Sequence, residues 1–264
     1  MMTMMNQKTR QVPSSALLRM LTTIDRAERQ VHEYFKDAPH RIYYRGVGDY
    51  EYRLVPGLLR EMKDAEGSVV AGPLLKYERE IVESVEREYP VELRNFTFVE
   101  KLVWMQHYGF PTRLLDVTRN KLVALYFAVT GSCQKDDGVV YVVGIPESQV
   151  VQAKDVSEER LGEYNPTLLL SPALTERQRR QQGGFLLMGD KKYAWYDEKR
   201  CGSKVCDRVS DSGIVVEEKR ISADDKDAIR EELAQGWGIT THFLFPEDPG
   251  EYRDELVDSF VKKL

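Results

Sequence analysis

The stretch from Thr97 to Thr130 constrains the fold most, because two apolar segments in it enclose a run of polar residues. The first segment, TFVEKLVWM, and the last, LVALYFAVT, are typical of buried helices. Between them, Gly109 and Pro111 interrupt the helical pattern. Polar groups held between two core segments need hydrogen-bond partners or a ligand. We therefore look for a functional site among the polar residues of this stretch, which are Gln106, His107, Thr112, Arg113, Asp116 and Thr118.

The composition favours one domain with a sizeable core. The chain has 264 residues, of which 42% are hydrophobic. We expect a flexible N-terminus over residues 1–13 and a single domain over residues 14–264 that carries packing helices at both ends. Neither an internal repeat nor a long low-complexity linker calls for a second domain.

Charge and cysteine content exclude several classes of function. A net charge of −5 argues against general binding of DNA or RNA. A local basic patch is still compatible with this net charge. Every apolar run falls short of the ~20 residues of a membrane helix, and the first residues lack the apolar stretch of a signal peptide. We expect a cytoplasmic protein with no membrane association. The three cysteines, Cys133, Cys201 and Cys206, fit neither a disulfide framework nor a zinc site, so no metal is expected.

Helical and strand patterns alternate without a strict βαβ order. Amphipathic spacing predicts helices from Ser14 or Ser15 to residue 34 and over residues 73–89, and a capping box of Thr97 and Glu100 opens a third that stops at Gly109. Further helices are predicted over 121–130, from Ser222 to Gly236, and along Tyr252, Leu256, Phe260 and Leu264. Strands are predicted over 41–46, 138–145, 183–188, 214–221 and 239–245. The fold class is α+β with a mostly antiparallel sheet.

Arg45 is the first candidate ligand-binding residue. It stands at the predicted end of a strand, where its five-donor guanidinium suits a phosphate or carboxylate, and Gly46 would let a ligand approach the backbone. The alternative is a structural ion pair between Arg45 and an aspartate.

The polar run after residue 105 has structural explanations of its own. Arg113 and Asp116 are spaced for an ion pair, and Asp116 or Thr118 could cap the following helix. These explanations leave out Gln106 and His107, which lie where the preceding helix ends. A lone histidine is more often a hydrogen-bonded core residue than a catalyst.

Two later segments add candidates. Gln182 closes a basic run just before the paired glycines Gly183 and Gly184. Glu217 and Glu218 interrupt an apolar strand, so one of them can face a cleft and the other solvent. The sequence lacks the phosphate-binding, dinucleotide-binding, zinc-protease and nucleophile-elbow motifs, which disfavours hydride transfer and P-loop hydrolysis.

Several of these segments together resemble the FRG domain. They are Tyr44-Arg45-Gly46, LVPGLLRE, QHYGFPTRLLDVT with ALYFA after it, QQGGFLL and the final FLFP. The resemblance spans roughly residues 20–260 and implies no established reaction.

A more distant similarity links this layout to ADP-ribosyltransferases, which hold NAD in a split antiparallel sheet. It implies an ADP-ribosyltransferase-like sheet, with NAD as the substrate. Arg45, Gly46, Gln106, Thr112 and Arg113 would bind NAD, and Asp116 to Thr118 would replace the Ser-Thr-Ser-like strand. The catalytic candidates are His107, Asp116, Thr118, Gln182 and Glu217.

The chain departs from those enzymes at the catalytic glutamate, because glycine follows Gln182 where an E-x-E or Q-x-E pattern is expected. Either Glu217 or Glu218 would then have to substitute. We expect a toxin, effector or defence protein that transfers ADP-ribose to a macromolecule or to water. The alternative is a non-catalytic module that recognises a nucleotide or a protein. The sequence leaves the oligomeric state open.

Overall fold

The computed structural model describes residues 15–50, 54, 56–58, 74–130, 135–164, 166–173, 175–189 and 213–246. Several predictions lie outside these residues: the flexible N-terminus over 1–13, the last amphipathic helix, and the three cysteines.

Within the described residues, the strands form one open sheet in the order β4-β5-β6-β2-β1-β3-β7. All neighbouring strands are antiparallel except β4 and β5. The mostly antiparallel α+β class predicted from the sequence is therefore confirmed. The strands are β1 (His40–Val47), β2 (Leu114–Thr118), β3 (Gly138–Pro146), β4 (Val150–Gln152), β5 (Thr167–Leu170), β6 (Gly183–Leu187) and β7 (Val215–Ile221).

The sheet consists of two parts that meet at one residue pair. Strand β1 pairs with β3 along its whole length, and β2 pairs with β6 from end to end. Between β1 and β2, however, the ladder contains only Tyr44 opposite Thr118. The two central strands therefore part on either side of this pair, and we call this place the split.

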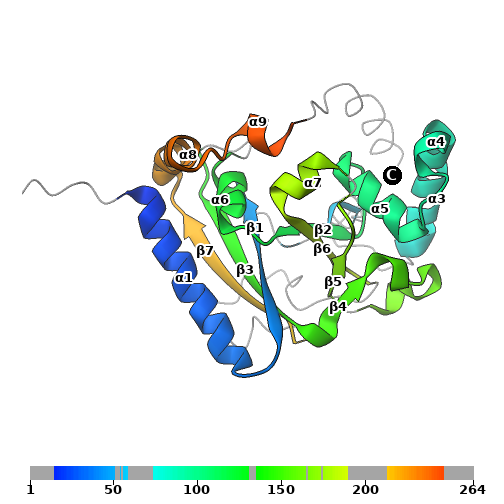
Figure 1. Cartoon of the computed structure of the whole chain (residues 1–264), viewed down its shortest axis with the longest axis horizontal. Helices are drawn as coiled ribbons and strands as arrows, with labels where there is room; N and C mark the ends of the chain where they lie inside the picture. The colour runs from blue at the N-terminus through cyan, green and yellow to red at the C-terminus, as the bar shows by residue number, and fades with distance from the viewer. Residues whose placement is uncertain are drawn as a thin grey trace, which may run out of the picture.

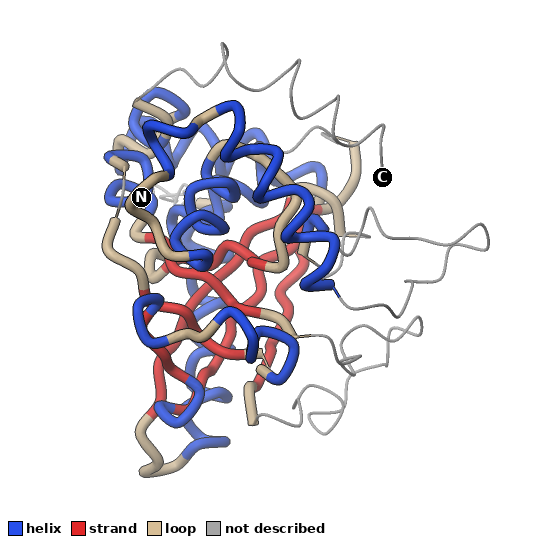
Figure 2. Tube along the Cα trace, turned by 90° about the vertical axis from the view of Figure 1, so that its right-hand side faces the viewer, coloured by secondary structure: helices blue, strands red, loops and turns tan. Residues whose placement is uncertain are grey.

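The helices that contribute to the described cores pack on one face of the sheet (Figures 1 and 2). The bounds of the helices and short 3-10 turns are α1 (Ala16–Phe35), α3 (Leu74–Glu88), α4 (Pro90–Leu93), α5 (Phe98–His107), α6 (Lys121–Thr130), η1 (Glu147–Gln149), η2 (Ala153–Asp155), η3 (Glu158–Glu163), α7 (Glu176–Gln181), α8 (Ala223–Trp237) and α9 (Thr241–Leu244). None of the helices in the described ranges is long and apolar enough to cross a membrane.

One face of the sheet carries two separate cores. Helices α1, α6 and α8 pack with Tyr44, Val142 and other residues of β1, β3 and β7. Helices α3 and α5 pack with Leu114, Phe185 and other residues of β2, β5 and β6. In Figure 1, α1 and α8 lie at one end of the molecule and α3 and α4 at the other. On the opposite face, a third core runs across the split, since it contains Tyr43 of β1 together with Leu115 and Leu186.

Local signals explain most helix ends. The capping box of α5 is present as predicted, because Thr97 accepts from the main chain of Glu100 and the Glu100 carboxylate accepts from Thr97. Ser222 caps α8 as predicted, but this helix ends at Trp237, with Gly238 in the left-handed conformation instead of Gly236. The predicted cap of α6 was wrong. The Asn120 carboxamide caps this helix by accepting from Leu122 N at 3.0 Å.

The predicted strand over residues 239–245 was also wrong. Thr240 accepts a hydrogen bond from Phe243 N and opens the one-turn helix α9. Helix α7 fixes this turn, because Arg180 donates to Phe243 O and Gln181 to Leu244 O. Leu244 is buried in the core of α1, α6 and α8. These tertiary contacts override the β-branched and aromatic composition of the segment.

Candidate functional site

Arg45 lies in the split between β1 and β2. Its Nη1 donates a hydrogen bond of 2.7 Å to Asp116 O and lies 3.9 Å from Asp116 Oδ2. The Arg45 side chain is 19% exposed and that of Asp116 55%. The guanidinium therefore links two strands whose main chains pair only once, and it leaves an accessible carboxylate beside it. Arg45 is thus held by an aspartate, as the structural alternative predicted.

Gln106 connects this pair to the end of α5. Its Nε2 donates to Asp116 Oδ2 at 2.6 Å, and its Oε1 accepts from Thr112 Oγ1 at 2.6 Å. Thr112 Oγ1 in turn accepts from Leu114 N at 3.1 Å. A continuous chain of hydrogen bonds thus orients the Asp116 carboxylate. We call Arg45, Gln106, Thr112 and Asp116 the split cluster.

Arg113 does not join the split cluster. Its side chain is fully buried and pairs with Glu78 of α3, which also accepts from Arg113 N at 2.9 Å. The predicted ion pair between Arg113 and Asp116 is therefore wrong. Glu78 was not predicted as a site residue, although the pattern contains a signal. Glu78 lies on the same helix stripe as the buried Ile81 and Val85, where an acid needs a partner.

His107 follows Gln106 but faces α7. Its Nδ1 lies 3.4 Å from Thr175 Oγ1, and its carbonyl accepts from Arg177 at 3.1 Å. Burial, and secondly the charge of Arg177, lower the pKa of His107 to about 4. The imidazole is therefore neutral at pH 7. The His107 ring contacts Thr175 of the segment that leads into α7.

Thr118 and Gln182 lie at the other side of the split. Thr118 Oγ1 donates to Gln181 O at 2.6 Å and accepts from Asn120 N at 3.0 Å. Gln182 has an exposed side chain and a left-handed backbone with φ 48° that ends α7. Its carbonyl accepts from Arg119 N at 3.1 Å. Both residues thus shape the turn from α7 into β6.

The two glutamates of β7 lie on opposite faces of the sheet. Glu217 stands in the same cross-strand row as Val142, Tyr44 and Thr118. Three strand spacings, about 14 Å, therefore separate the main chains at Glu217 and Thr118. The Glu217 side chain is buried and contacts Lys219 at 3.0 Å. Glu218 lies on the opposite face, in the cross-strand row of Tyr141 and Arg45, and it accepts from Tyr50.

Gly46 has a packing role in the structure. A Cβ atom at this position would lie 1.7 Å from Ala124 O, because the backbone of α6 crosses β1 here. The absent side chain therefore makes room for α6 at the position where a ligand was predicted to approach the backbone.

The described residues contain no group of three or more histidine, cysteine or acidic side chains that could hold a metal ion. The split cluster instead offers a guanidinium for an anion and an accessible carboxylate for a cation.

The family model of the FRG domain matches residues 40–137. This part of the chain, less than half of its length, therefore carries an FRG domain. It contains β1, β2 and α6, and with them every residue of the split cluster, whereas Gln182 and Glu217 lie beyond it. Neither the curated proteins nor the solved structures yielded a match.

Proposed function

We propose that the split cluster binds NAD and that the protein transfers ADP-ribose from NAD to a macromolecule or to water. One observation carries the proposal: an arginine and an exposed carboxylate lie together where β1 and β2 part. Residues 40–137, which form the FRG domain, supply both side chains. A toxin, effector or defence protein remains the setting that we propose for such an activity.

Arg45 supplies the anion-binding part of this proposal. A guanidinium recognises phosphate oxygens through several parallel N–H donors and keeps its charge at any pH that a protein tolerates. Its contact with Asp116 O fixes its position in the split. Arg45 would therefore meet the pyrophosphate of NAD without having to be ordered first.

Asp116 supplies the carboxylate in this proposal. When the bond between nicotinamide and ribose C1′ breaks, its electron pair leaves with nicotinamide and positive charge develops on the ribose. A carboxylate held beside that charge lowers the barrier. Water or a side chain of the target then bonds to C1′ and loses a proton. Gln106 holds Asp116 Oδ2 at 2.6 Å, so the carboxylate is oriented in advance.

A second candidate is a module that recognises a nucleotide or a protein without catalysis. The position of Glu217 favours it, because this buried residue lies about 14 Å along the sheet from Thr118. In this alternative, Asp116 mainly positions Arg45 and Gln106.

Ligand binding and catalysis are tested separately. Thermal unfolding with and without millimolar NAD reports binding, since ligand at 100 times its dissociation constant adds about 2.7 kcal/mol of stability. Release of nicotinamide reports bond cleavage. We expect both signals from the native chain. If NAD stabilises the protein but no nicotinamide is released with any target tried, the protein is a recognition module. If NAD neither stabilises the protein nor releases nicotinamide, NAD is rejected as the ligand.

Two variants assign the roles, each with a matched control. We expect Arg45→Ala to lose the stabilisation by NAD, whereas the exposed Arg160→Ala keeps it. We expect Asp116→Asn to keep the stabilisation and lose nicotinamide release, whereas the exposed Asp136→Asn retains both.

A further inference from the structure

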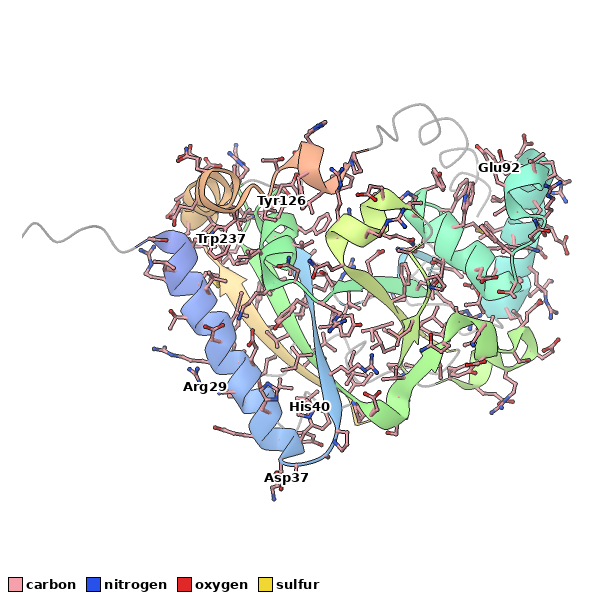
Figure 3. All side chains as sticks on the ribbon, in the orientation of Figure 1. Arg29, Asp37, His40, Glu92, Tyr126 and Trp237 are labelled. Carbon is pink, nitrogen blue, oxygen red and sulfur yellow. The ribbon has the colours of Figure 1, made fainter. Side chains whose placement is uncertain are left out.

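A small aromatic cavity lies at the end of the molecule formed by α3, α4 and α5. Its volume is about 130 Å³, and Tyr89, Glu92, Trp104 and Tyr108 line it. An engineered apolar cavity of about 150 Å³ holds one benzene molecule, so this cavity has room for one group of that size. Figure 3 shows Glu92 on α4 at the outer edge of the molecule.

Two helix ends bring the four side chains together. Trp104 and Tyr108 are spaced i, i+4 along and just beyond α5, so both lie on one side of it. Tyr89 and Glu92 come from the first turn of α4, where Tyr89 is the N-cap residue. The ring centroids of Trp104 lie 5.2 Å from Tyr89 and 4.3 Å from Tyr108, with interplanar angles of 52° and 42°. The rings are tilted against one another, and all three of them line the cavity.

The charge at this cavity selects the ligand. Aromatic faces carry negative electrostatic potential, so they attract a cation placed over them. Glu92 adds a full negative charge, and it forms no ion pair with any residue in the described ranges. Lys101, on the same helix as Trp104, is paired with Glu86, from which its Nζ lies 2.5 Å. Anions are therefore disfavoured here, and a small cation is favoured.

We propose that Tyr89, Glu92, Trp104 and Tyr108 form a binding site for a quaternary ammonium group. A primary ammonium is strongly hydrated and needs several acceptors, whereas a trimethylammonium group spreads its charge over methyl groups that pack against rings. The group can belong to a free small molecule such as choline or to a trimethylated lysine of a protein. The site is distinct from the split cluster and does not depend on NAD.

Calorimetric titration of the full chain tests this site with matched probes. Choline is compared with 3,3-dimethylbutan-1-ol, which has the same shape without the charge. We expect choline to bind about tenfold more tightly than the alcohol, a factor that corresponds to ~1.4 kcal/mol. A peptide with trimethyllysine, compared with its unmodified form, serves as the second arm. Binding of choline alone indicates a free metabolite, and preference for the modified peptide indicates a protein partner.

Substitutions at exposed positions keep the test independent of folding. We expect Glu92→Gln to weaken choline binding about threefold to fivefold, as for loss of a solvent-accessible charge pair. Glu88→Gln, an exposed residue of α3 that does not line the cavity, should leave it unchanged. Equal affinity for choline and the alcohol, no binding of either cationic probe, or equal effects of the two substitutions would overturn the proposal.

Discussion

Arg113 and Glu78 form an ion pair inside the protein, with side chains that are 0% and 1% exposed. Glu78 also accepts from Arg113 N at 2.9 Å, and Arg113 Nη1 lies 3.4 Å from Met188 O. One pair of side chains thus connects α3, the start of β2 and the end of β6.

Removing one partner of this pair should destabilise the fold strongly. We expect Glu78→Gln to lower the free energy of unfolding by about 3–5 kcal/mol, because the buried Arg113 charge loses the carboxylate that pairs with it. Urea titration measures the change.

A double substitution separates the charge from the packing. Glu78→Gln with Arg113→Met should recover about 2 kcal/mol relative to the sum of the single changes. Arg160→Ala removes an ion pair whose side chains are two-thirds exposed, and it should leave stability unchanged within error. Purely additive effects would contradict a coupled buried pair.

Two glycines should respond oppositely to alanine. At Gly46, the new Cβ would meet Ala124 O at 1.7 Å, so we expect a loss of at least about 3 kcal/mol from overpacking. Gly236 lies in α8 with nothing within 4 Å of an added Cβ, so alanine should stabilise by about 0.5–1 kcal/mol. Chemical unfolding of both variants checks the pair. A tolerated Gly46→Ala would show that α6 is not seated against β1 as described.

His107 should make stability depend on pH in a defined window. Its pKa falls from 6.5 to about 4 on folding, so the unfolded chain binds the proton more tightly. The contribution of His107 is fully present above pH 6.5 and decreases as the pH falls towards 4. The difference in unfolding free energy between native protein and His107→Gln should therefore shrink over this range.

NMR titration of the His107 ring measures the pKa of this residue directly, with an expected midpoint near pH 4. Arg177→Gln should raise that midpoint, because it removes the second cause of the lowered pKa. A midpoint above 6 in the native protein would contradict the buried, neutral imidazole.

Asp116→Asn tests whether the split cluster catalyses or only binds. The amide keeps the shape of the side chain but loses the charge that would stabilise a developing cation. We expect kcat for nicotinamide release to fall by about 10²-fold or more, with KM for NAD little changed. Initial rates measure both constants. A change confined to KM would make Asp116 a binding residue.

Elements whose signals are local were predictable from the sequence. The capping box at Thr97 needs only Glu100 three residues later, and the apolar run that became β3 is buried on both faces as expected. The split cluster was partly predictable for a similar reason, since Gln106, Thr112 and Asp116 lie within one short stretch.

Contacts between distant segments were not predictable. Arg113 could be paired with Asp116 by spacing alone, but its true partner lies 35 residues away in α3. The segment over 239–245 has strand-like composition, yet its bonds to Arg180 and Gln181 make it helical. The location of Glu217 depends on the register of four strands, which no local pattern reports.

The single pair of Tyr44 with Thr118 also sets how the molecule resists unfolding. Between β1 and β2 the main-chain ladder narrows to this one pair, so the two described parts of the sheet depend more on side-chain packing, including the core that spans both parts. Amide protons of β3 and of β6 should therefore report two opening free energies in hydrogen exchange, because each half can lose its ladder while the other keeps it.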